Sequence, residues 1–137
     1  MIEILNRQNR YWINRRRFKN LLKKLVKHYR LKNPEVSLAF VNTKTIKKIN
    51  RKFLRKNAPT DVLSFPIREK SVDGNYYLGD IIISVPQAFK QCLSLDHGLE
   101  RELELLTIHG FLHLLGYEHS ARIEKEEEKI RNLWIRE

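Results

Sequence analysis

Hydrophobic residues in this chain follow two spacings, one typical of strands and one typical of helices. Four short segments are apolar or alternate between apolar and polar positions, so they are predicted strands. They span residues 2–6, 36–41, 61–66 and 76–84. The sequence Asp73-Gly74-Asn75 is a turn signal between the last two of them.

Longer segments repeat their apolar residues at three- and four-residue steps, as helices with one buried face do. The first is predicted to begin after a cap at Asn14 and to end near Arg30, and the second to begin with Thr43 as its cap. A short helix is expected after Pro86, and a longer one from about Leu99. A final helix is predicted over 121–136, with Ile123, Ile130, Leu133 and Trp134 turned inward and with 124–129 as a solvated, charged face.

Strands interleaved with helices, followed by helices alone, indicate an α+β fold with one mixed sheet of about four strands packed with helices. The length of 137 residues suits a single domain over 1–137. The composition, with 42% hydrophobic and 31% charged residues, is that of an ordinary globular protein. The order of the strands in the sheet does not follow from these patterns.

Several classes of protein are disfavoured by what the sequence lacks. No apolar run approaches the roughly 20 residues of a membrane helix, and the alternating first residues are unlike a signal peptide. Cys92 is the only cysteine, which excludes an internal disulfide framework and a cysteine-rich zinc ribbon, and we expect no disulfide-linked partner. We therefore expect a cytoplasmic protein with no membrane partner and with Cys92 as a buried thiol.

The net charge of +11 is distributed very unevenly along the chain. Residues 1–60 contain 18 Lys and Arg against two acids, whereas residues 61–137 contain nine against 14. Such a positive half attracts polyanions, and nucleic acid is the most common of these. The alternative is that the lysines only solvate helix faces, but such surfaces normally mix both signs. The pattern favours a polyanion partner.

Histidines are concentrated in the segment from His109 to His119, which holds three of the five in the chain. His109 and His113 are four residues apart, so on a helix their Cβ atoms lie about 5–6 Å from each other and can share one metal ion. Gly116 can end that helix, so that the chain turns and brings His119 back as a third ligand. Three protein ligands leave a zinc ion one open position, as in catalytic sites. The alternative, histidines that only pack in the core, is harder to reconcile with this clustering.

Gly110 follows the first of these histidines, where helical zinc peptidases of the His-Glu-x-x-His type have a glutamate as general base. The absence of that base argues against peptide hydrolysis. It favours another metal-assisted hydrolysis.

Three motifs, in matching order and spacing, resemble those of the YbeY family of bacterial endoribonucleases. The first is the segment 109–119, His-Gly-Phe-Leu-His-Leu-Leu-Gly-Tyr-Glu-His. The second combines Asn50 with the segment 59–66, Pro-Thr-Asp-Val-Leu-Ser-Phe-Pro, and the third is the segment 78–81, Leu-Gly-Asp-Ile. Together they span most of residues 50–119, whereas the N-terminal third matches only in its expected layout.

The resemblance implies one Zn²⁺ ion bound by His109, His113 and His119, on a zincin-like helix beside the mixed sheet. It also implies action on RNA, in maturation of small-subunit ribosomal RNA (rRNA) and in ribosome quality control, with the ribosome as a partner. Glu118 stands where the family usually has Asp, and it is a candidate catalytic residue. The family's active-site Arg aligns with Leu54, and the neighbouring Arg55 is our candidate for its catalytic role. The alternatives are that Lys56 or Arg51 serves, or that the role is absent.

Within this hypothesis, an RNA phosphate would be attacked either by its own ribose 2′-OH or by water, with an Arg holding the phosphate. Asp61, Asp80 and Glu118 are candidates to orient the histidines through their second ring nitrogens. For Asp61 and Asp80, turn and sheet-end chemistry is an equal alternative. Two other functions stay open: a small zinc metallopeptidase-like hydrolase, and a non-catalytic ribosome-binding protein with structural zinc.

Overall fold

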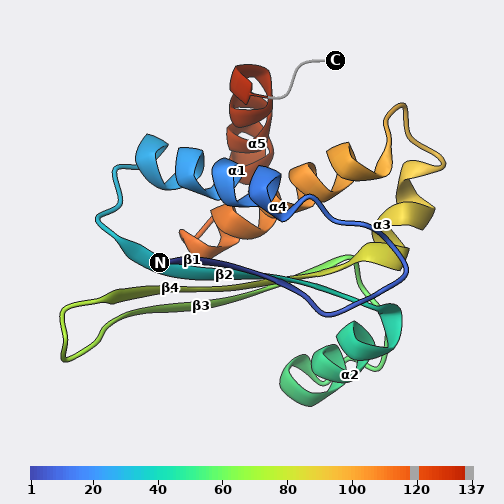
Figure 1. Ribbon diagram of the computed structural model, residues 1–137, viewed down its shortest axis with the longest axis horizontal. Coiled ribbons are helices and arrows are strands. Elements are labelled where there is room, and N and C mark those ends of the chain that lie inside the picture. The colour runs from blue at the N-terminus through green and yellow to red at the C-terminus, as the bar shows by residue number, and fades with distance from the viewer. Residues whose placement is uncertain (118–120, 135–137) are drawn as a thin grey trace.

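A four-stranded mixed sheet forms the centre of the molecule (Figure 1). The computed structural model describes residues 1–117 and 121–134. The strands are β1 (Ile2–Asn6), β2 (Pro34–Val41), β3 (Val62–Lys70) and β4 (Tyr76–Ser84), in the spatial order β1-β2-β4-β3. Strands β1 and β4 run parallel to β2, and β3 pairs with β4 as an antiparallel hairpin. The hairpin therefore ends the sheet with β3 as an edge strand.

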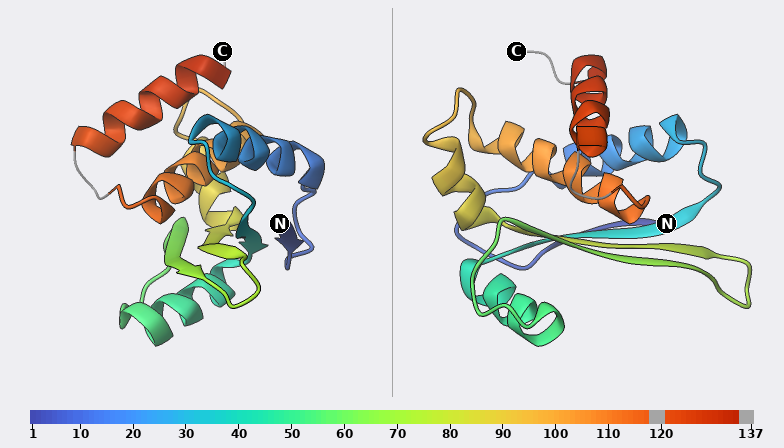
Figure 2. Two further views of the ribbon diagram at one scale, coloured as in Figure 1. Left: turned by 90° about the vertical axis from the view of Figure 1, so that its left-hand side faces the viewer. Right: turned by 180° about the vertical axis from the view of Figure 1, so that it is seen from behind.

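Helices cover the two faces of the sheet unequally (Figures 1 and 2). Helices α1 (Arg15–His28) and α4 (Leu99–Leu114) lie on one face, and α5 (Ala121–Trp134) lies on their outer side. Helix α2 (Thr43–Leu54) lies on the other face, and α3 (Val85–Cys92) connects β4 to α4. None of the helices in the described residues combines the length and hydrophobicity that a membrane span requires. This architecture confirms the predicted single α+β domain with a mixed sheet.

The main core lies between the sheet and the pair α1 and α4. Alternate residues of β2 point to it, and the apolar stripe of α1 packs on them, with the rings of Phe18 and Phe40 edge to face at 4.9 Å. Leu22, Leu38 and Phe111 are fully buried in the same cluster. Burial of this apolar surface is the main stabilising contribution to the fold.

A second, smaller core lies under α2 and consists of Val41, Ile46 and Leu63. It covers only one end of that face of the sheet (Figure 1). At the C-terminal end of α2, Phe53 is 61% and Leu54 46% exposed. Helix α2 is thus held by few buried contacts and ends in an open region at the sheet edge.

The predicted helices and strands are confirmed, with small differences at their ends. Asn14 caps α1, as predicted, but the cap of α2 is Asn42 rather than Thr43, because the Asn42 side chain accepts from the backbone N–H of Thr45 at 2.8 Å. Strand β3 extends four residues past Pro66, since its pairing with β4 continues to the hairpin turn. Leu133 is half exposed, so its predicted inward position is wrong.

Gly110 lets α4 approach the β3–β4 hairpin more closely than any other residue would. A Cβ atom on Gly110 would lie 2.7 Å from Cγ2 of Ile81 and 3.1 Å from Oγ of Ser64. The Ser64 hydroxyl also donates a hydrogen bond to the carbonyl oxygen of Gly110, at 3.1 Å. The position that holds a glutamate in helical zinc peptidases is therefore pressed against the sheet and has no room for a side chain.

We predict that Gly110→Ala lowers the free energy of unfolding by about 1–2 kcal/mol, because overpacking against the buried Ile81 outweighs the better helix propensity of alanine. Gly98→Ala is the comparison variant, since a Cβ there meets nothing within 4 Å and its only expected loss is that of glycine as the N-cap of α4. Urea denaturation of both variants and the wild type measures the differences. A Gly110→Ala variant as stable as the wild type would contradict a close contact at Gly110.

Candidate functional site

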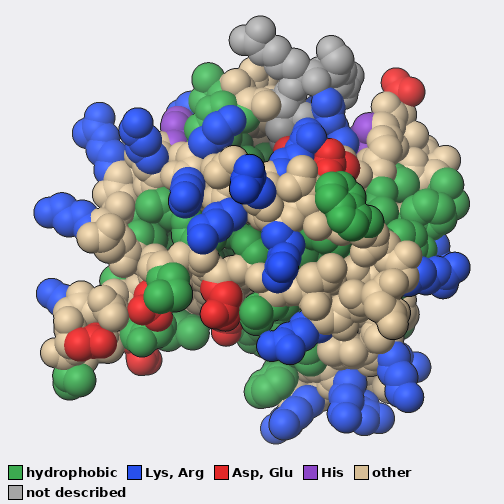
Figure 3. Space-filling model, viewed as in Figure 1, with side chains coloured by type: hydrophobic (Ala, Val, Ile, Leu, Met, Phe, Trp, Pro, Cys, Tyr) green, Lys and Arg blue, Asp and Glu red, His purple; other side chains and the backbone are tan. Residues whose placement is uncertain are grey.

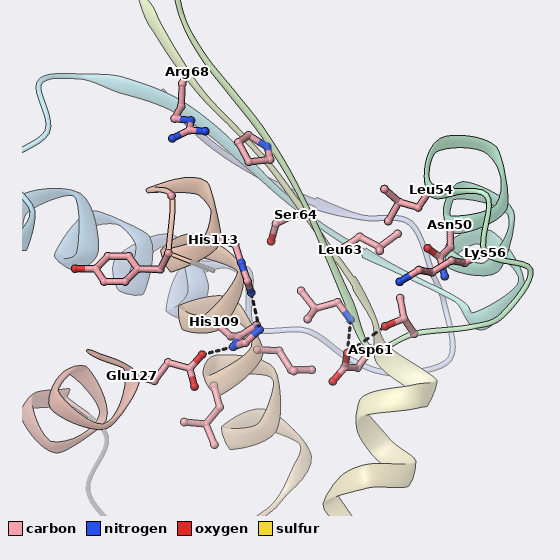
Figure 4. Close-up of a pocket in the computed structure, with 17 residues that line it drawn as sticks. Asn50, Leu54, Lys56, Asp61, Leu63, Ser64, Arg68, His109, His113 and Glu127 are labelled. Atoms are coloured by element: carbon pink, nitrogen blue, oxygen red, sulfur yellow. Dashed lines mark hydrogen bonds and ion pairs between the residues drawn. The ribbon is translucent and has the colours of Figure 1, made fainter. Parts of the chain in front are cut away.

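An open pocket of about 1010 Å³ lies at the edge of the sheet, where β3 runs past α4 (Figure 4). Its walls come from four elements far apart in the sequence: the C-terminal end of α2, strand β3, helix α4 and helix α5. His109, His113 and Glu127 lie on one side of it, and Leu54 and Lys56 on the other. Within the described residues, this pocket is therefore an open depression beside the edge strand β3 rather than an enclosed cavity.

His109 and His113 lie one turn apart on α4 and both line this pocket. Their Nε2 atoms are 3.0 Å from each other, and their ring centroids are 4.6 Å apart. The structure therefore brings the two histidines together as the four-residue spacing predicts. Both rings therefore direct their Nε2 atoms to the same point in the pocket.

Glu127 of α5 contacts the other ring nitrogen of His109, Nδ1. A carboxylate on Nδ1 holds the proton there, orients the ring and leaves Nε2 as a lone-pair donor, as partners of metal-binding histidines do. This contact was missed at the sequence level, where 124–129 was interpreted as a solvated face. That interpretation is wrong for Glu127, which contacts His109, and for Glu126, which accepts a hydrogen bond from the hydroxyl of Tyr29.

The hydrogen bond between Tyr29 and Glu126 ties α5 to the end of α1. Burial, followed by this hydrogen bond, raises the pKa of the Tyr29 phenol above its usual range. The phenol therefore keeps its proton, and its role as a donor, at every physiological pH. Because Glu126 directly precedes Glu127, this hydrogen bond fixes α5 next to the residue that contacts His109.

The two histidines fit a shared metal ion. Two ligand nitrogens at about 2.0–2.1 Å from one tetrahedral ion lie about 3.3 Å apart, close to the observed separation of the Nε2 atoms. Within the described residues, no group of three His, Cys, Asp or Glu side chains completes a site. The predicted third ligand His119 and the predicted catalytic Glu118 lie outside the described residues. The zinc ligands thus stay a prediction, which the geometry of the first two supports.

Helix α4 ends immediately after His113, as Gly116 predicts. The N–H of Gly116 donates to the carbonyl of His113 at 3.0 Å, and the N–H of Tyr117 donates to that of Leu112 at 3.1 Å. This pair of bonds, with Gly116 at φ +101°, is a Schellman motif. It turns the chain away from the helix axis at the edge of the pocket.

Asp61 and Asp80 do not have the orienting role considered for them. Asp80 lies next to Ile81 on β4, so it faces the side of the sheet away from α4, where it accepts a hydrogen bond from Ser37 at 2.5 Å. Asp61 lines the pocket but accepts from the backbone N–H of Val62 at 2.8 Å and from Gln91 at 3.2 Å. Sheet-end chemistry, the stated alternative, accounts for Asp61, whereas Asp80 makes its hydrogen bond between neighbouring strands in the middle of β4.

The predicted catalytic Arg55 is the left-handed C-cap of α2, and the pocket lining includes its neighbours Leu54 and Lys56 but not Arg55 itself. Asn50 closes this loop, because its Nδ2 donates to the carbonyl of Ala58 at 2.9 Å. Its Oδ1 is buried without a hydrogen-bond partner among the described residues, next to the pocket wall.

A family model described as endoribonuclease YbeY matches residues 3–134 of this chain. The chain belongs to the YbeY family. The match covers all nine helices and strands of the described structure except the first residue of β1. The resemblance inferred from the three motifs is thereby confirmed over nearly the whole sequence.

Named relatives agree with this assignment. The chain is 47% identical over 104 residues to the endoribonuclease YbeY of Oceanobacillus iheyensis, covering 70% of this chain and 66% of that one. It is 43% identical over 122 residues to that of Persephonella marina, covering 88% and 79%. The solution structure of TM1509 from Thermotoga maritima superposes with a TM-score of 0.65 at 27% identity, covering 98% and 89%. The match spans just under two thirds of the Oceanobacillus protein.

We predict that Glu127→Gln weakens zinc binding by about 10–100-fold, because the amide orients His109 less well and no longer increases the basicity of its ring. Glu128→Gln removes the same charge from an exposed neighbour and is the matched control. Competition with a chromophoric chelator measures the affinities. Unchanged affinity in the Glu127 variant would show that its contact with His109 does not support a metal.

Proposed function

We propose that this YbeY-family chain is a zinc-dependent endoribonuclease that cuts single-stranded RNA. Its expected place of action is the cytoplasm, in maturation of small-subunit rRNA on or near the ribosome and in ribosome quality control. The observation that supports this best is the convergence of two histidine Nε2 atoms in an open pocket, in a chain whose family is one of endoribonucleases.

In this proposal His109, His113 and His119 hold the zinc ion, and Glu127 keeps His109 in the tautomer that binds metal. Zinc bound there would lower the pKa of a coordinated water toward about 7 and polarise a phosphoryl oxygen. The pocket opens at an edge strand, so a single strand of RNA can lie across it without its ends entering the protein.

The basic half of the sequence supports RNA as the substrate. In the structure its cations lie on the outer faces of α1 and α2, and Figure 3 shows them across much of one side of the molecule. Contacts with phosphates would give affinity without sequence readout, and this affinity would fall with salt concentration. The exposed cations of the two helices are Arg15, Arg16, Arg17, Lys19, Lys23, Lys24 and Lys27 on α1 and Lys44, Lys47, Lys48, Arg51 and Lys52 on α2.

The metallopeptidase alternative is disfavoured by packing as well as by sequence. Gly110 is pressed against Ile81 and Ser64, so the helix cannot present a glutamate base at that position in this arrangement. A peptidase would need a base from elsewhere.

We predict that His113→Ala abolishes cleavage of labelled single-stranded RNA and of small-subunit precursor rRNA, and that a chelator does the same to the wild-type protein. RNA binding and the melting temperature should change little, because His113 lies at the wall of an open pocket. His28→Ala, which changes a histidine of α1 that does not line this pocket, is the matched control and should cleave normally.

The other outcomes of this experiment identify the competing functions. A large fall in melting temperature without zinc, with no cleavage by the wild type, would indicate a ribosome-binding protein with structural zinc. Cleavage of casein but not of RNA would indicate a peptidase. Equal RNA cleavage by the wild type, the chelated protein and His113→Ala would indicate a contaminating nuclease and contradict the proposal.

A further inference from the structure

Cleavage of a phosphodiester places negative charge on phosphoryl oxygens in the transition state, and a fixed cation beside them stabilises it. Two Lys or Arg residues line the pocket within the described part of the chain: Lys56, in the loop after α2, and Arg68, on β3. Leu54, which aligns with the family's Arg, lines the same pocket with an uncharged side chain. The charge expected at that position must therefore come from elsewhere.

Arg68 reaches the pocket because β3 is irregular at this point. Pro66 pairs with Gly79 and Glu69 pairs with Tyr77, so two residues of β3 stand opposite one residue of β4. Such a bulge changes the direction of a side chain, and Arg68 has the left-handed backbone with φ +48° that accompanies it here. Residues other than glycine seldom adopt this conformation, so the backbone of Arg68 is an unusual local feature of β3.

The guanidinium of Arg68 lies beside the C-terminal end of α4. Its Nη1 is 3.1 Å from the point where a Cβ on Gly116 would stand, three residues after His113. The C-terminal end of a helix carries partial negative charge and favours a cation there. No carboxylate of the described residues forms a salt bridge with Arg68, so its charge remains available to a ligand.

We propose that Arg68 is the phosphate-binding residue of this site and supplies the positive charge that Leu54 lacks. Figure 4 shows Arg68 beyond His113, across the pocket from Leu54 and Lys56. A guanidinium can bind two phosphate oxygens at once through parallel N–H groups, which fixes the orientation of the phosphate as well as its charge. This inference rests on the proposed ribonuclease function and adds the residue that holds the scissile phosphate.

The test compares kcat/KM for cleavage of one labelled single-stranded RNA by Arg68→Asn, Arg68→Lys and the wild type. Asparagine tolerates the left-handed backbone, so this variant removes the guanidinium with little effect on the strand. We expect Arg68→Asn to lose about 10²-fold in kcat/KM and Arg68→Lys to lose less, at unchanged zinc content and melting temperature. Lys70→Ala, which removes an exposed cation from the same strand, is the matched control and should lose little.

A second change distinguishes charge in the pocket from a structural role. Leu54→Arg, introduced into Arg68→Asn, should restore at least about tenfold of the lost activity, because position 54 lines the same pocket. Wild-type activity in Arg68→Asn would overturn the role of Arg68 and leave the proposed function intact. Loss of activity that Leu54→Arg does not restore, accompanied by a lower melting temperature, would show that Arg68 is structural. A wild-type protein that cleaves no RNA would contradict both proposals.

Discussion

The close approach of α4 to the β3–β4 hairpin at Gly110 determines how the site is built. With no side chain between them, the helix backbone rests on Ile81 and is tied to Ser64 through its carbonyl oxygen. This contact fixes the rotation of α4 about its axis, and the rotation directs His109 and His113 to the edge of the sheet. The pocket is open because this edge is β3, beyond which the described residues add no further strand.

Charge is arranged so that acids join the layers and cations remain outside. On α4, Glu104 accepts from Arg17 of α1 at 3.1 Å, and this hydrogen bond raises the pKa of the Arg17 guanidinium. Glu102 of the same helix is buried, and its Oε1 lies 2.7 Å from Nε2 of His97. The acidic second half of the chain is thus partly used for internal contacts, while most cations of the first half face solvent. A polyanion that approaches the protein therefore meets more exposed cations than the acidic second half of the sequence implies.

The local parts of the site could be predicted from the sequence, since they depend on residues close together in the chain. The pairing of His109 with His113 follows from helical spacing, and the end of α4 follows from Gly116. The strands and helices were predicted for the same reason, from apolar periodicity. Strand order was not predicted, because pairing between distant segments leaves no mark in a single sequence.

The long-range parts of the site could not be derived from the sequence alone. Glu127 could not be singled out because it lies in a continuous run of charged residues, and only the packing of α5 on α4 brings it to His109. Arg68 depends on a bulge in β3 that the apolar pattern does not reveal, because the bulge arises from how β3 pairs with β4. Arg55 was chosen for its position in the sequence, but the left-handed end of α2 leaves it outside the pocket lining that its neighbours form. The two alternatives for Asp80 could not be separated from the sequence, because its face of the sheet was unknown.

Stoichiometric activation by zinc tests the central claim most directly. Metal-free protein would be titrated with Zn²⁺ while cleavage of a labelled single-stranded RNA is followed. A site built on His109 and His113 predicts activity that rises linearly and reaches its maximum at one zinc ion per chain. Cleavage at full rate before any zinc is added, with metal content below a tenth of an equivalent, would contradict a metal-dependent ribonuclease in this pocket.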